Sequence, residues 1–196
     1  MDVLGAKYDH AVYNFWKGGE LQRQVTLHVD DLLYGGTDLF HRKVITSFMR
    51  IFTVGSKEVT DFVYVGWHLK QSRQGITVSQ DNYIKKVDSP DMDVYSCRDG
   101  EEVLKEEEQS HFRKLVGNIN WLAMNTRPDL CFDAMEMACN FGKAKIKDIK
   151  RAARILRKAK ERGMELQFNN LGNAKEAVLM VCAHGRYGKL NKVDSC

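Results

Sequence analysis

Residues 25–36, VTLHVDDLLYGG, place two adjacent carboxylates, Asp30 and Asp31, inside an apolar, β-prone run that ends in two glycines. Adjacent buried acids repel each other and lose hydration, so a chain keeps them there only with compensation. The pattern leaves two interpretations open: a solvated Asp-rich turn, which is the commoner case, or a pair of ligands for a divalent cation. Residues 25–34 read locally as one long strand, and both interpretations place the carboxylates at a sheet.

Strand patterns flank this run on both sides. Residues 11–15 alternate apolar and polar side chains before the glycines at 18–19, which predicts an antiparallel hairpin with the residues that follow. Residues 61–69 and 76–79 predict a second hairpin, turned at residues 72–75.

A helix is predicted between these hairpins, starting at Thr37 or Asp38 and ending at Gly55. We interpret its aromatic stripe as core packing. Strand, helix and hairpin in this order predict an α+β fold with a helix covering one face of a sheet. The stripe consists of Phe40, Val44, Phe48 and Phe52.

Residues 101–163 are helix-prone throughout, after a loop or domain boundary at 89–100 that is rich in Asp, Ser, Pro and Gly. Pro128 suits the first turn of a helix, and Gly163 suits a helix end. Two sets of apolar residues recur at helical spacing. They are Leu115, Ile119 and Leu122, and Ile149, Ala152, Ala153 and Leu156.

Several segments match, in order, the motifs of one protein family. They are HVDDLL at residues 28–33, FVYVGWHL at 62–69, GITVSQDNYI at 75–84, FRKLVGNINWLA at 112–123 and TRPDL at 126–130. This order resembles the reverse transcriptases of copia-type LTR retrotransposons. The resemblance identifies the segments, in turn, as the Tyr-X-Asp-Asp box, the primer-grip strand, the segment that returns from it, and parts of the thumb.

The resemblance implies a partial polymerase palm at residues 1–88, with an antiparallel sheet, a helix and a primer-grip hairpin. A helical thumb would follow at 89–163 and a truncated RNase H start at 164–196, where 165–168 and 177–181 predict strands. It also implies that residues 25–34 form two short strands joined by a turn at the carboxylates.

The same resemblance assigns site residues. Asp30 and Asp31 would be the catalytic carboxylates and would bind Mg²⁺ or Mn²⁺, which prefer oxygen ligands. His28 would neighbour the nucleotide site, where the family commonly has Tyr. Gly66 and Trp67 would press on the primer strand, although Trp67 is an equally good candidate for ordinary core.

The family function is RNA-directed DNA synthesis from deoxynucleoside triphosphates. The third palm Asp and the fingers have no counterpart in this sequence, and His184 stands where the family has the first RNase H Asp. We therefore expect a reverse transcriptase fragment that is catalytically incomplete on its own. The alternative is a non-catalytic nucleic-acid-binding or structural module derived from it.

The last predicted helix is strongly basic, and its cations suit the phosphates of a template–primer RNA–DNA duplex. A solvated helix face is the other interpretation of such a charge run. The candidate contacts are Lys147, Lys150, Arg151, Arg154, Arg157 and Lys158.

Bulk properties exclude several classes of protein. A net charge of +4 is too mild to identify a nucleic-acid binder by itself. The five cysteines are odd in number and widely spaced, so we expect reduced thiols, with Cys131 and Cys139 as small core residues of a helix. Since neither a signal peptide nor a membrane-spanning run is recognisable, we expect an intracellular protein, cytoplasmic or nuclear, without a membrane partner.

Overall fold

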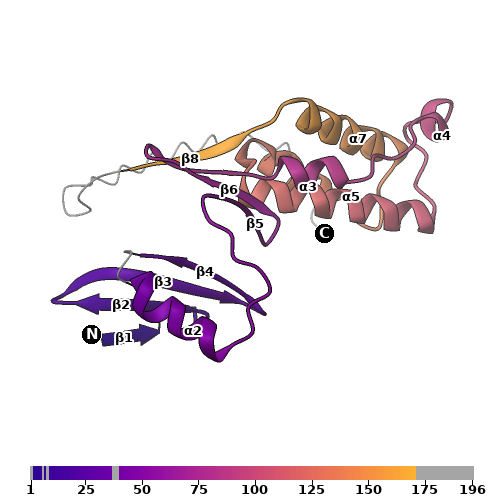
Figure 1. Cartoon of the computed structure of the whole chain (residues 1–196). Coiled ribbons are helices and arrows are strands. Elements are labelled where there is room, and N and C mark those ends of the chain that lie inside the picture. The colour runs from indigo at the N-terminus through magenta and orange to yellow at the C-terminus, as the bar shows by residue number, and fades with distance from the viewer. Residues whose placement is uncertain (1, 6, 8, 37–39, 171–196) are drawn as a thin grey trace.

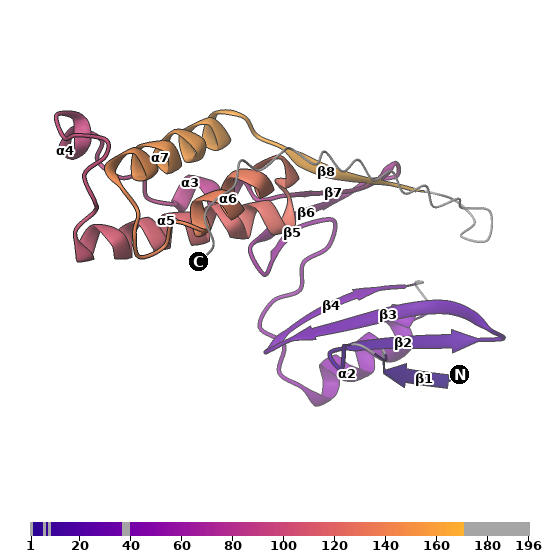
Figure 2. The same cartoon turned by 180° about the vertical axis from the view of Figure 1, so that it is seen from behind.

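The computed structural model describes residues 2–5, 7, 9–36 and 40–170 (Figure 1). These residues form an α+β fold with two four-stranded antiparallel sheets, which confirms the predicted class. One sheet lies in the N-terminal part of the chain, and the other continues into the helical part (Figures 1 and 2). The expected strand at residues 177–181 and His184 lie outside the described residues.

The first sheet has the strand order β1-β2-β3-β4. Gly18 and Gly19 form its first predicted turn with φ values of 61° and 77°, a left-handed conformation that glycine adopts without a steric penalty. The predicted hairpin at this turn is confirmed. The strands are β1 (Asp2–Gly5), β2 (Val12–Lys17), β3 (Glu20–His28) and β4 (Asp31–Gly35).

A helical segment covers one face of this sheet (Figures 1 and 2). It consists of η1 (His41–Ile45) and α2 (Thr46–Ile51). Phe40 is fully buried beneath it, with its ring edge-on to Phe15 at 5.2 Å between centroids. The aromatic core predicted for this helix is therefore centred on Phe40.

Phe52, the last residue of the predicted stripe, is not part of the core. The helix ends at Ile51 instead of continuing to Gly55, and Phe52 is extended, 53% exposed and stacked on Phe48. The next two residues, Thr53 and Val54, are β-branched and poor helix formers, which explains the earlier end. The two candidate N-caps, Thr37 and Asp38, lie outside the described residues, and the structure describes only the backbone of Val44.

The second sheet has the order β5-β6-β7-β8. The single strand expected at residues 61–69 is wrong, because a two-residue turn at Val65 and Gly66 divides it. Their φ values of 49° and 81° are both left-handed, as a type I′ hairpin turn requires. The strands are β5 (Asp61–Tyr64), β6 (Trp67–Gln71), β7 (Gly75–Ser79) and β8 (Glu165–Asn169).

Replacing Val65 by asparagine should stabilise the protein by about 1 kcal/mol. Left-handed φ costs an ordinary residue roughly 1–2 kcal/mol, whereas Asn tolerates it and Asn-Gly is the favoured type I′ pair. Urea unfolding measures the change. Val63→Asn is the control, since Val63 is an exposed valine inside β5, where the substitution should gain nothing. Equal effects of both substitutions would contradict the strain at Val65.

The helices of the C-terminal part pack around one core. The predicted apolar sets are confirmed: Leu115, Ile119 and Leu122 are buried, as are Ile149 and its helical neighbours. Pro128 starts a helical turn and Gly163 follows the last helix, as predicted. The elements are α3 (Asp81–Lys86), α4 (Asp93–Ser96), α5 (Glu106–Asn125), η2 (Pro128–Leu130), α6 (Cys131–Ala138) and α7 (Ile146–Glu161).

The boundaries expected after residues 88 and 163 do not coincide with changes of core or sheet. Ile84 and Val87 are buried in the same core as α5 and α7. Beyond Gly163, β8 pairs antiparallel with β7, so it belongs to the sheet that contains the β5–β6 hairpin. These contacts join residues far apart in sequence, which local patterns do not reveal.

Arg127 fastens the end of α7 to the turn after α5. Its side chain is buried, and Nη1 donates to the carbonyl oxygens of Ala159 and Arg162, both at 3.1 Å. Nε and Nη2 donate to the Asp129 carboxylate at 2.9 Å, which holds the pKa of that carboxyl below its usual value. Arg127 thus acts in helix packing.

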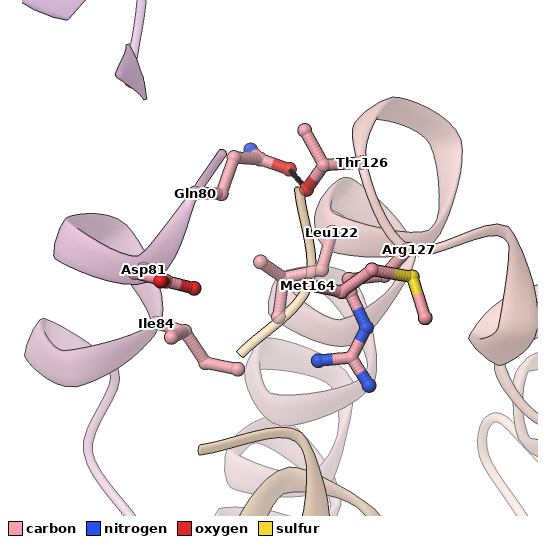
Figure 3. A pocket seen from close by; sticks show the side chains of 7 residues that line it. All are labelled: Gln80, Asp81, Ile84, Leu122, Thr126, Arg127 and Met164. Carbon is pink, nitrogen blue, oxygen red and sulfur yellow. Dashed lines mark hydrogen bonds between the residues drawn. The ribbon is translucent and has the colours of Figure 1, made fainter. Parts of the chain in front are cut away.

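Figure 3 shows Arg127 beside a small cleft between α3 and α5, where the Thr126 hydroxyl donates a hydrogen bond to Gln80 Oε1.

Cys131 and Cys139 are exposed, so their expected core role is wrong. Both lie on the outer side of α6 and its C-cap, while Ala134 and Met137 face the core.

Within the described ranges, no helix is both long and apolar enough to span a membrane.

Candidate nucleic-acid interface

The two adjacent carboxylates lie at a hairpin turn. His28 pairs with Asp31 across β3 and β4, so Val29 and Asp30 form the two-residue connection. This agrees with the turn implied by the family resemblance and excludes one continuous strand over residues 25–34. The acids do not need burial compensation, because Asp30 and Asp31 are both exposed.

Strain accompanies this turn. Val29 is 93% exposed and has a φ of 57°, an unusual conformation for a β-branched residue. Such strain tends to persist at functional sites, where the surrounding structure imposes it. The strands on either side of the turn hold Val29 in place, and its exposure leaves the tip open to a ligand.

The donor set at this turn suits a hard cation. Mg²⁺ and Mn²⁺ prefer oxygen ligands, and Asp30 and Asp31 offer carboxylates on neighbouring residues. Among the residues that the structure describes, no group of three or more His, Cys, Asp or Glu side chains is arranged to hold a metal ion. His28 is exposed beside this pair as the strand partner of Asp31.

The expected primer-grip residues lie at a second hairpin turn. Gly66 is the second turn residue, and Trp67 begins β6 opposite Tyr64 of β5. Trp67 is half-buried. An ordinary core residue would be fully buried, and a side chain that stacks on the primer would be fully exposed. Its indole Nε1 and the Tyr64 hydroxyl are shielded from solvent and have no hydrogen-bond partner among the described residues.

The β5–β6 turn lies on the side of the second sheet that is nearer the first sheet (Figures 1 and 2). Burial raises the pKa of Tyr64 above its usual value, and the negative charge of Asp31 raises it further. The charge of Asp31 thus acts on Tyr64, although the sequence separates the two residues by more than thirty positions.

The basic residues form a helix, α7, but acids from other elements neutralise several of them. Lys147 pairs with Glu101 at 2.6 Å, and hydrogen bonds from Lys145 and Lys147 lower the pKa of Glu101 to about 2. Arg151 pairs with Asp133 and Glu136 of α6. These pairs reduce the positive charge available to phosphates.

The four remaining candidates differ in whether another group already contacts their charge. Lys150 donates to a backbone carbonyl at 3.5 Å, and Arg157 lies 3.9 Å from Glu161 of its own helix. Arg154 and Lys158 are exposed, and no partner for either is found in the described part of the chain. Because they lie four residues apart, they project from one side of α7.

Sequence reasoning missed one feature of α5. Gly117 lies near the middle of this 20-residue helix, and a Cβ added there would meet nothing within 4 Å. Arg113 and Lys114 lie one turn before it on the exposed side, and Trp121, 39% exposed, lies one turn after it. The sequence does contain a signal for this feature, because glycine is unusual inside a helix-prone run.

Comparisons with known proteins add no relative: no protein-family model, curated protein or solved structure matches this chain.

Proposed function

We propose that this chain binds a template–primer RNA–DNA duplex and is part of a copia-type reverse transcriptase. Support comes from the order of its motifs, from the carboxylates at a hairpin turn and from the second hairpin beside them. The helical part then supplies surfaces for the duplex backbone.

The observation that carries this proposal is Gly117. A glycine inside a helix costs roughly 0.5–1 kcal/mol relative to alanine, and no neighbouring atom here excludes a methyl group. Close approach of an external molecule to the helix backbone gives such a glycine a function. Cations on one side and an indole on the other suit phosphates and stacked sugars or bases.

An RNA-containing duplex fits this face of α5. Its minor groove is wide and shallow, and proteins recognise it mainly by shape and by contacts to hydroxyls and phosphates. A helix with a bare backbone patch at Gly117 can approach such a groove closely, while Arg113 and Lys114 neutralise phosphates at its edge. Arg154 and Lys158 of α7 offer further contacts.

The proposal covers duplex binding and not DNA synthesis by this chain alone. Polymerisation by two metal ions needs a cage of carboxylates around ions roughly 3.5–4 Å apart. Asp30 and Asp31 would hold Mg²⁺ or Mn²⁺ only as part of such a cage, since both lie exposed on one turn. His28 and the Gly66–Trp67 turn would neighbour the nucleotide and the primer end.

Gly117→Ala separates the functional role of this glycine from a structural one. The substitution should raise the free energy of unfolding by roughly 0.5–1 kcal/mol and yet weaken duplex binding several-fold. Fluorescence anisotropy with an RNA–DNA duplex and urea unfolding measure the two effects. Gly55→Ala is the control, because a Cβ added there also meets nothing within 4 Å but the residue lies outside α5. Unchanged duplex affinity in Gly117→Ala would contradict the proposal.

A protein-binding role is the second candidate. Large apolar side chains are exposed on α5 and α6, where a soluble helix surface is usually polar. They are Met124, Phe132 and Met135, at 73%, 68% and 62% exposure. Binding through such residues depends little on salt, whereas duplex binding weakens steeply as salt rises.

A further inference from the structure

His41 of η1 contacts two other segments of the N-terminal part of the chain. Its Nδ1 lies 2.8 Å from the Tyr34 hydroxyl of β4, and its Nε2 lies 2.8 Å from the ammonium nitrogen of Lys57. The Tyr34 and His41 rings are also stacked, with 5.8 Å between centroids and 10° between planes. Both imidazole nitrogens are therefore engaged, one by the first sheet and one by the segment that follows α2.

Lys57 decides which nitrogen of the neutral imidazole carries the proton. An ammonium group has three donors and no acceptor, so it can bond Nε2 only when that nitrogen has a free lone pair. The ring proton then lies on Nδ1 and is donated to the Tyr34 hydroxyl, which can accept as well as donate. Burial raises the pKa of Tyr34, so the phenol stays neutral in this role.

A second proton on His41 must go to Nε2, where it sets two donors and two positive charges against each other. The contact at Nδ1 is unaffected, because that nitrogen already carries its proton. Among the described residues, no carboxylate is hydrogen-bonded to the ring, and the charged neighbours of His41 in its own helical segment, Arg42 and Lys43, are positive too. Arg23 of β3 lies over the adjacent Phe40 ring. Protonation therefore breaks the Lys57 contact and spares the Tyr34 contact.

The contact from Lys57 holds the middle of the connection between the two sheets. Residues 52–60 lead from α2 to β5, and all of them are exposed. Phe52 stacks on Phe48 at the start of this connection, and the Val59 carbonyl accepts from the Asp61 amide at its end. For residues 53–58, the bond to His41 is the one hydrogen bond found in the described part of the chain.

We propose that His41 and Lys57 form a pH-sensitive clasp, which holds residues 53–58 while His41 is neutral and releases them when His41 binds a proton. Histidine is the side chain that ordinarily titrates near neutral pH, so modest acidification is the signal. Because the Tyr34 contact persists, the release leaves β4 and η1 together. The free length of chain between the two sheets then grows as pH falls.

NMR of the imidazole nitrogens reports the clasp through the tautomer of His41. At about pH 7.5, the form with its proton on Nδ1 should outweigh the other form about tenfold, as expected for a hydrogen bond to a charged group. Lys57→Met removes the charge and should lose most of this preference. Lys43→Met is the control, because it removes an exposed cation two residues from His41 and should keep the preference. His41→Gln identifies the signal among those of the six histidines.

Backbone order at residues 53–58 reports the release. In the wild type, order parameters from nitrogen relaxation should fall there below about 0.6, the flexible range, on acidification from about pH 7.5 to about pH 5.5. In Lys57→Met they should lie below that value at both pH values. The turn at residues 72–74 is the internal control and should not change with pH.

A wild-type His41 with its neutral-state proton on Nε2 would overturn the proposal, since the ammonium could not donate to it. Equal order of residues 53–58 at the two pH values would do the same. If acidification also loosens the control turn, the comparison of wild type with Lys57→Met at the higher pH decides, and equal order in the two proteins would overturn the clasp. The spectra are recorded without nucleic acid, so the outcome is independent of duplex binding.

Discussion

Replacing Arg127 by alanine is expected to lower the free energy of unfolding by about 3–4 kcal/mol. The buried guanidinium makes hydrogen bonds to two carbonyls at the end of α7 and to both oxygens of Asp129. Hydrogen bonds to a charged group contribute roughly 1.5–3 kcal/mol each, and breaking a buried ion pair costs about 3–5 kcal/mol. Because Asp129 is partly exposed and can be rehydrated, the lower part of that range applies.

Urea unfolding of Arg127→Ala measures this loss. Arg154→Ala is the matched control, since Arg154 is exposed on α7 and its removal should change stability by less than about 0.5 kcal/mol. Arg127→Lys should recover only a small part of the loss, because an ammonium group cannot reproduce the planar, two-pronged contact with Asp129. A change below about 1 kcal/mol in Arg127→Ala would mean that the clamp on α7 contributes little.

Removing Arg154 and Lys158 together should reduce the salt dependence of duplex binding by about two units of slope. Each phosphate contact contributes roughly 0.9 to the slope of log affinity against log salt for B-form DNA, and we expect a similar value for an RNA–DNA duplex. These two cations are exposed, whereas Lys147 and Arg151 are neutralised by carboxylates. Between about 50 and 200 mM salt, the wild type should therefore lose about tenfold more affinity than the double alanine variant, so the difference in affinity between the two proteins is largest at low salt.

Fluorescence anisotropy titrations between about 50 and 200 mM salt give this slope. The control removes two exposed cations from the other end of the chain, Arg42 and Arg50, and so makes the same change in net charge. An unchanged slope in this control would locate the contact on α7. Equal slopes in both double variants and in the wild type would mean that the basic face of α7 is exposed to solvent and does not contact the duplex phosphates.

Local sequence determined the elements whose signals are short-range. The glycines at 18–19 set a hairpin turn, and the apolar spacing of α5 and α7 set which faces are buried. An Asp-rich turn at the carboxylates was one of two local interpretations, and the family resemblance placed it between two short strands. The left-handed Val29 itself gives no local turn signal. For the same reason the turn at Val65 was missed.

Tertiary structure alone decided which residues of the candidate site come together. The pairing of β8 with β7 joins segments more than eighty residues apart, and the charge of Asp31 acts on Tyr64 of a separate hairpin. It also decided which cations of α7 stay free, since the neutralising acids belong to α6 and to the loop before α5. Helical spacing is a property of neighbouring residues, whereas charge neutralisation and strand pairing depend on contacts between distant ones, and only the folded chain contains those contacts.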